Sequence, residues 1–150
     1  MLKWLRANGC PWNPETVFRL AARQGHLEVL CWARDNGGEL TEDLCNWAAG
    51  EGHLVALQGL RAVGCPWGAT VCATAAMEGQ LEILQWLRAN GCPWDLRTCF
   101  SAVHEGHVEV LRWARENGCP WTAETRALAA SKRGYTDDLG NLVDYRGNPI

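Results

Sequence analysis

The sequence predicts an all-α protein built from a row of short helical repeats. The first observation is a motif, Gly-Cys-Pro-Trp, that recurs with a period of 27 to 28 residues, as expected of a repeat array. Its copies begin at Gly9, Gly64, Gly91 and Gly118, and a degraded copy occupies 37–40. The second observation is that apolar residues between the copies follow helical spacing, and no stretch alternates as strands do.

Composition and charge exclude several classes of protein. The 150 residues carry a net charge of −3, which gives no general attraction to nucleic acid or to anionic membranes. No window approaches the apolar length of a transmembrane helix, and the first residues lack the apolar core of a signal peptide. We therefore expect neither nucleic-acid binding nor membrane insertion. The eight cysteines predict a reducing, intracellular compartment, by default cytoplasm or nucleus, or an organelle if a targeting segment is missing from this chain.

The repeats make one expected domain, 1–150. Each full repeat reads as turn, helix, tight turn and helix, and a half-repeat at 1–8 precedes the first of them. The full repeats span 9–36, 37–63, 64–90, 91–117 and 118–146, followed by a tail at 147–150. The half-repeat and the motif-like tail fit an array cut from a longer protein as well as an array with its own caps.

The repeat at 91–117 shows how local signals predict the helices. Gly91 suits the left-handed position that ends the preceding helix, and Asp95 is a good N-cap for a helix over about 96–104. Gly106 ends that helix, and a second helix with a wide apolar face follows over about 107–116. The first and last full repeats carry an extra residue, which we place in the turn before the first helix.

Several segments of the chain resemble the ankyrin repeat. The run Gly-His-Leu-Glu-Val-Leu at 25–30 looks like the start of the second ankyrin helix, and Ala-Ala-x-x-Gly at 21–25 and 48–52 looks like the end of the first. Arg-Ala-Asn-Gly at 88–91 matches the family's Asn-Gly exit. An ankyrin repeat has about 33 residues, so these repeats are shorter. The resemblance implies an ankyrin-like α-solenoid of stacked helix-turn-helix repeats with shortened β-turn fingers.

Small residues recur on the first helix of each repeat. Because small side chains let neighbouring helices approach closely, we expect them to be buried between repeats. They are Ala21, Ala48, Ala75, Ala102 and Ala130.

The cysteines fall into two columns of equivalent positions. One column lies in the first helix, where the first repeat has Phe18, and the other lies in the turns. The first column is Cys45, Cys72 and Cys99, and the second is Cys10, Cys65, Cys92 and Cys119. Equivalent cysteines of neighbouring repeats are expected roughly 10 Å apart, beyond the Cα separation of about 7 Å that a disulfide allows. We interpret them as structural, with no metal and no cofactor bound.

Three other columns also have structural interpretations. Tryptophans in the turns and second helices are expected to pack on one another, although a row of aromatic rings could also hold bases or pigments. Histidines at 26, 53 and 107, replaced by Gln80, indicate a hydrogen-bonding turn residue. The arginines at 61, 88 and 115 suit the C-terminal ends of helices and the faces of tryptophans, with an anion-binding stripe as the alternative. No arrangement of catalytic residues repeats, so we expect no enzyme.

Function is expected in the columns that vary between repeats. The predicted activity is non-catalytic binding of a protein partner through the concave helical face, at Arg23, Trp47, Met77, Phe100 and His104. Trp47 is the expected hot spot, because equivalent positions hold Leu20, Thr74 and Ser101. The alternatives are a subunit held permanently in a larger assembly and a cysteine-based redox or metal-binding protein. The degraded copy at 37–40 keeps the period without Cys, Pro or Trp, which marks the motif as scaffold.

Overall fold

The computed structural model describes residues 7–9, 13–132 and 143. Within these residues it contains nine α-helices and no β-strand, which confirms the all-α prediction. The helices are α2 (Pro14–Arg23), α3 (Leu27–Asp35), α4 (Glu42–Gly50), α5 (Leu54–Ala62), α6 (Ala69–Met77), α7 (Leu81–Ala89), α8 (Leu96–Glu105), α9 (Val108–Glu116) and α10 (Ala123–Ser131). Most of the expected half-repeat at 1–8, the expected second helix of the last repeat and the tail lie outside the described residues.

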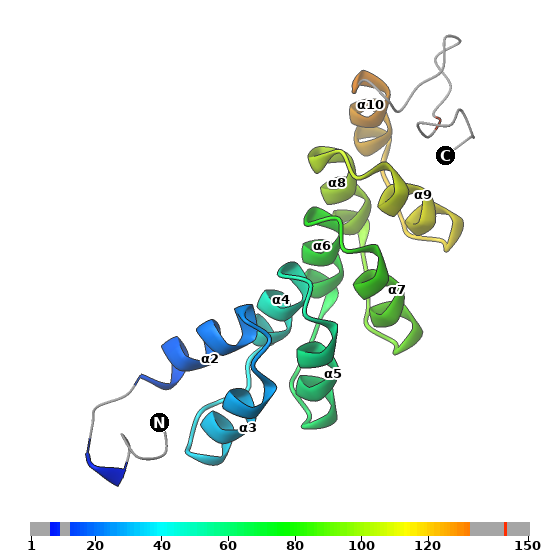
Figure 1. The fold of residues 1–150 in the computed structure, drawn as a ribbon. Coiled ribbons are helices and arrows are strands. Elements are labelled where there is room, and N and C mark those ends of the chain that lie inside the picture. The colour runs from blue at the N-terminus through cyan, green and yellow to red at the C-terminus, as the bar shows by residue number, and fades with distance from the viewer. Residues whose placement is uncertain (1–6, 10–12, 133–142, 144–150) are drawn as a thin grey trace.

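The helices lie in two rows, one for each helix of a repeat (Figure 1). The first helices α2, α4, α6, α8 and α10 pack side by side along one row, and the second helices α3, α5, α7 and α9 form the other. Each of α2, α4, α6 and α8 also packs against the second helix of its own repeat. The core is therefore continuous along the array, since every inner helix has neighbours before it, after it and beside it.

Local capping signals define where the helices begin and end. The side chain of Asn13 accepts a hydrogen bond from the Thr16 amide at 3.1 Å, and that of Asp95 accepts one from the Arg97 amide at 2.9 Å. Gly106 ends α8 in the left-handed conformation, with a φ of 89°. The two helices predicted in the repeat at 91–117 match α8 and α9 to within one residue at each end.

The extra residue of the first full repeat lies in a helix and not in the turn, where we had placed it. Both α2 and α4 begin directly after an N-cap, Asn13 and Thr41, that stands at the same distance from the preceding motif glycine. Helix α2 has 10 residues, whereas α4 has 9. The turn keeps its length because its residues link the two rows, whereas a helix can lengthen by one residue at its exposed first turn.

The last described helix, α10, is shifted by one residue from the expected alignment. Ala129 is fully buried, whereas Ala130, which we assigned to the small buried column, is exposed. Counted from its N-cap Thr122, the buried positions of α10 coincide with those of α4, α6 and α8. In α10 the extra residue of the repeat therefore lies after the buried positions, which leaves Ala129 buried and Ala130 exposed.

The small column is otherwise buried as expected, and Ala75 tests its role. Ala75 is fully buried on α6, which packs on both α4 and α8. Leucine at this position would overpack the interface, so Ala75→Leu should lower the free energy of unfolding by about 1–3 kcal/mol. Urea denaturation measures this loss. Ala89→Leu, at the exposed end of α7, is the control and should change stability by no more than about 0.5 kcal/mol; equal losses would contradict the packing role.

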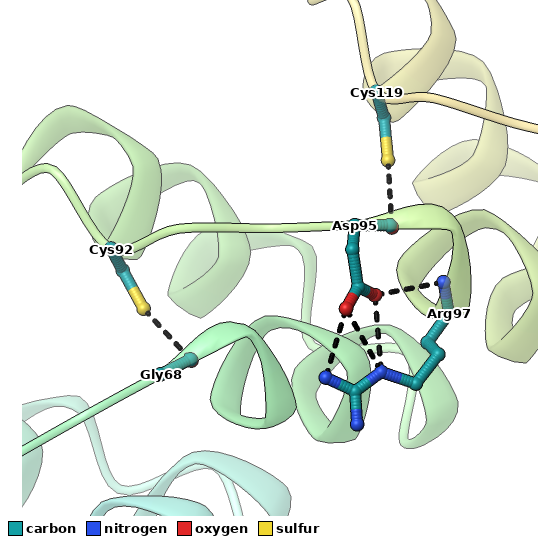
Figure 2. A network of polar contacts seen from close by, with 5 residues as sticks. All are labelled: Gly68, Cys92, Asp95, Arg97 and Cys119. Atoms are coloured by element: carbon teal, nitrogen blue, oxygen red, sulfur yellow. Dashed lines mark hydrogen bonds and ion pairs between the residues drawn. The ribbon is translucent and has the colours of Figure 1, made fainter.

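The cysteines pair across the two columns. Each first-helix thiol hydrogen-bonds with the turn thiol of the next repeat, a contact that our comparison of equivalent positions missed. The pairs are Cys45 with Cys65, Cys72 with Cys92 and Cys99 with Cys119, and all six thiols are free and buried. The turn thiols also donate to backbone carbonyls, Cys92 to Gly68 at 3.4 Å and Cys119 to Asp95 at 3.6 Å (Figure 2).

Pairing shifts the pKa values of the thiols in opposite directions. The hydrogen bond with the partner thiol, followed by burial, raises the pKa of Cys45, Cys92 and Cys99, whereas the hydrogen bond with the partner thiol lowers the pKa of Cys65 and Cys119. A buried thiol with a raised pKa is a poor nucleophile and a poor metal ligand, so Cys45, Cys92 and Cys99 act as small apolar residues. Cys31, outside both columns, is half-buried.

At the first interface between repeats a different pair replaces the two cysteines. Phe18 stands at the first-helix position and Gly38 at the turn position. A Cβ atom on Gly38 would lie 2.1 Å from Cε2 of Phe18, so the phenyl ring occupies the space that a turn side chain would need. The phenyl ring of Phe18, next to a glycine without a side chain, thus fills the volume that two thiols fill elsewhere.

Turn side chains connect each repeat to the backbone of the repeat before it. The ring Nε2 of His53 donates to the carbonyl of Arg23 at 2.7 Å, and that of His107 to the carbonyl of Met77 at 2.9 Å. Gln80 replaces histidine and donates to the carbonyl of Gly50 at 3.3 Å. This confirms the hydrogen-bonding role predicted for the column; we call these contacts the turn-to-carbonyl bonds.

Arginines at the ends of the second helices cover the turn tryptophans. The guanidinium of Arg61 lies 4.0 Å from the ring centroid of Trp67, and those of Arg88 and Arg115 lie at 4.4 and 4.3 Å over Trp94 and Trp121. Trp94 also meets Trp113 edge to face, with centroids 5.9 Å apart. The packing interpretation of both columns is confirmed for these residues, because the cations are engaged with indole rings.

Candidate partner-binding surface

The five predicted contact residues all lie on the row of first helices. Arg23 is the last residue of α2, Met77 the last of α6, and Phe100 and His104 lie on α8. These four are exposed, Met77 by 40% and Phe100 by 44%. Trp47, on α4, is half-buried and packs against the core. The surface thus presents apolar side chains at several repeats.

Phe100 and His104 are the two predicted residues that the structure shows in direct contact. Their rings stack one helical turn apart, with centroids 5.9 Å apart and an interplanar angle of 23°. His104 also hydrogen-bonds through Nδ1 to Glu105 at 2.7 Å, and this bond lowers the pKa of the Glu105 carboxyl. The pair forms a flat, half-polar patch near one end of the row.

Arg23 has a partner within the chain. Its Nη2 lies 2.8 Å from Oε1 of Glu51, in the next repeat. Both side chains are about half exposed, and such a surface ion pair contributes about 0–1 kcal/mol. A carboxylate from a partner can therefore compete for Arg23 at low energetic cost.

Trp47 lines a pocket of about 490 Å³ between α2 and α4. Phe18, Leu44 and Trp47 supply its apolar part, and these side chains are buried or half-buried. Three exposed acidic residues also line it: Glu15, Glu39 and Asp43. We call these six residues the Trp47 pocket. Its volume is within the range of about 300–1,000 Å³ found for small-ligand sites.

The pocket exists because this repeat departs from the others. Turn residues 38–40 are Gly-Glu-Leu where other repeats have Cys-Pro-Trp, and Gly37 and Gly38 line the opening without side chains. Trp47 projects where later repeats have Thr74 and Ser101. We interpreted the motif as scaffold because of this degraded copy, yet the copy contributes Gly37, Gly38 and Glu39 to a pocket that Trp47 also lines.

The sequence contained a signal for the residues that we missed. Phe18, Glu39 and Leu44 belong to columns or turns that we treated as scaffold. The signal was a coincidence: the repeat that loses Cys, Pro and Trp from its turn is also the repeat with a tryptophan at 47.

The carboxylates of the Trp47 pocket are not neutralised within the described part of the chain. No ion pair joins Glu15, Glu39 or Asp43 to a described cation. The contrast is Asp95, whose carboxylate lies 2.8 Å from Nη2 of Arg97 (Figure 2), and Arg97 holds the pKa of Asp95 below its usual value. The pocket therefore combines an apolar wall with uncompensated negative charge.

Two absences among the described residues bear on the kind of site. No group of three or more His, Cys, Asp or Glu side chains among them could hold a metal ion. No helix in that part of the chain is long and apolar enough to cross a membrane. As for known proteins, no family model matches the chain and no curated protein is significantly similar to it.

Proposed function

We propose that the protein is a non-catalytic protein-interaction module, an ankyrin-like α-solenoid with shortened turns that binds a protein partner through its row of first helices. The observation that carries the proposal is the Trp47 pocket: a half-buried tryptophan beside a hollow in an otherwise repetitive scaffold. Tryptophans that fill or border such hollows are enriched among binding hot spots. Arg23, Met77, Phe100 and His104 extend the surface along the row.

The division between repeating and varying positions supports this proposal. The recurring Cys, Trp, Arg and His side chains are engaged in contacts that hold the repeats together. The varying positions on the first helices present exposed side chains of different chemistry from repeat to repeat. Repeat scaffolds bind through such extended surfaces, so specificity would come from the varying positions.

Trp47→Thr tests the proposal with a residue that the array already uses at the equivalent position, Thr74. The tagged protein is used to capture partners from the source cell, and bound proteins are compared between wild type and variant by quantitative mass spectrometry. A partner that binds through this surface should be depleted at least tenfold by Trp47→Thr, as expected when a hot-spot contact of about 2 kcal/mol is lost.

The control is Val55→Thr, which changes a side chain exposed by 69% on the second-helix row. It should leave capture unchanged. The helical circular dichroism signal of both variants must match that of wild type. If Trp47→Thr lost much of its helicity, Trp47 would belong to the core, and if it captured the same partners at the same level, the proposed surface would be wrong.

A permanent structural subunit is the second candidate, and one observation favours it. Large apolar side chains are exposed on both rows, Leu20 by 55% on α2 and Val55 by 69% on α5. A partner that covers both rows would bury them continuously. The isolated chain would then aggregate at micromolar concentrations and become monodisperse when co-expressed with its partner, whereas a free binding module is monodisperse alone.

A further inference from the structure

We infer that the Trp47 pocket takes the cationic side chain of a lysine or arginine from a partner protein; the inference rests on the proposed function. The shape, the charge and the aromatic wall of the Trp47 pocket all suit this one occupant. The occupant must be long and flexible enough to reach the apolar wall and must carry positive charge at the opening.

The shape of the pocket admits a long side chain from outside. Residues from the first halves of α2 and α4 line the hollow, and these two helices pack side by side (Figure 1). Gly37 bounds it without a side chain and with open space beside it, so a partner's backbone can approach the turn closely there. The aliphatic stem of lysine or arginine can then pack on Phe18 and Trp47 while its head remains near the opening.

The charge of the pocket comes from three separate segments. Glu15 lies in the first turn of α2, Asp43 in the first turn of α4, and Glu39 in the turn between repeats. Carboxylates at helix starts are explained in part by the helix dipole. That explanation does not extend to Glu39, which lies outside any helix and replaces the proline of other repeats. An external cation would satisfy all three carboxylates.

The aromatic wall selects the same ligand. A guanidinium or ammonium group over an indole face gains electrostatic attraction from the ring quadrupole. The chain itself contains this contact where a cation is available: Arg61 lies 4.0 Å from the centroid of Trp67. No described cation covers Trp47 in the same way, so a partner can supply it.

The combination is specific to this interface. At the position of Trp47 the following repeats have Thr74 and Ser101, and at the position of Asp43 they have Thr70 and Arg97. The start of α8 therefore has the ion pair of Asp95 and Arg97 where the start of α4 has carboxylates without a described partner. A basic segment of a partner would be attracted to one end of the row only, which would orient it along the surface.

Selection of peptides by charge tests the inference. A library of random linear peptides displayed on phage is selected on the whole chain and on the double variant Glu39→Lys, Asp43→Lys. Wild type should enrich peptides with a recurrent Lys or Arg, and the double variant should lose them and enrich Asp or Glu instead. Glu82→Lys, Glu116→Lys is the matched control: these carboxylates are exposed on the second-helix row, and reversing them should leave the enriched peptides basic.

A titration then measures the contribution of the cation directly. The best peptide selected on wild type is compared with the same peptide carrying norleucine in place of its recurrent Lys or Arg, by isothermal titration calorimetry. Norleucine should weaken binding to wild type at least tenfold. The neutral variant Glu39→Gln, Asp43→Asn, with unchanged helical circular dichroism, should bind the two peptides within threefold of each other.

The outcomes separate this inference from the proposed function. If the selected peptides show no preference for Lys or Arg, or if reversing Glu39 and Asp43 does not change them, the inference of a bound cation is wrong. The proposed binding of a protein partner would then remain. If no peptide is enriched on either protein above the bare resin, both this inference and the proposed function are contradicted.

Discussion

Gly38→Cys should lower the free energy of unfolding by about 1–3 kcal/mol, the cost of overpacking a filled interior. The new Cβ would stand 2.1 Å from Cε2 of Phe18 and 3.0 Å from the carbonyl of Ala33, so the ring must leave its site. Phe18→Cys alone should also destabilise, by about 3 kcal/mol, because it leaves a cavity where a buried phenyl ring stood.

The double variant Phe18→Cys, Gly38→Cys should be more stable than either single variant. It recreates at the first interface the thiol pair that Cys45 and Cys65 form at the next. A thermodynamic cycle from urea denaturation under reducing conditions measures the coupling between the two positions. Strictly additive losses would show that Phe18 and Gly38 do not compensate for one another, and the equivalence of the interfaces would then be wrong.

Trp94→Ala should lower the free energy of unfolding by about 2–3 kcal/mol, somewhat below the range of about 3–5 kcal/mol for fully buried aromatic residues. Trp94 is half-buried, but its ring contacts both the guanidinium of Arg88 and the ring of Trp113. Its removal uncovers both, so the loss includes the aromatic and cation contacts as well as the area.

Trp94→Leu is the matched comparison, because the repeat at 37–63 carries Leu40 at the same position and keeps its fold. Leucine should recover about half of the loss, since it restores apolar area but not the contact with the cation. The midpoint of urea denaturation, followed by circular dichroism and by tryptophan fluorescence, measures both variants. A loss below about 0.5 kcal/mol for Trp94→Ala would contradict a packing role.

Most of the helical layout could be predicted because its causes are local. Asn13, Asp95 and Gly106 mark helix ends through their own hydrogen bonds and backbone angles, which depend on residues one turn away. The period then places equivalent elements in equivalent positions. Because the His and Gln side chains of the turns occupy equivalent positions, we could predict that they form hydrogen bonds without knowing the acceptors.

The pairing of the cysteines and the Trp47 pocket depend on contacts between different columns. Comparison of equivalent positions in neighbouring repeats cannot show that Cys45 meets Cys65, because the two occupy different places in their repeats. The pocket has the same origin, since Phe18 and Gly38 become neighbours through the stacking of two repeats. The register predicted for α10 was wrong for a local reason: we placed the extra residue of the last full repeat in the turn before the helix, whereas the buried positions of α10 follow from its N-cap Thr122.

The turn-to-carbonyl bonds allow the binding surface to diversify. Their acceptors are the main-chain carbonyls of Arg23, Gly50 and Met77, three residues with nothing in common but their place in the repeat. Every amino acid supplies that carbonyl, so the side chain at this position can change in one repeat without weakening its attachment to the next. The array can thus acquire new specificity one repeat at a time while its assembly stays the same.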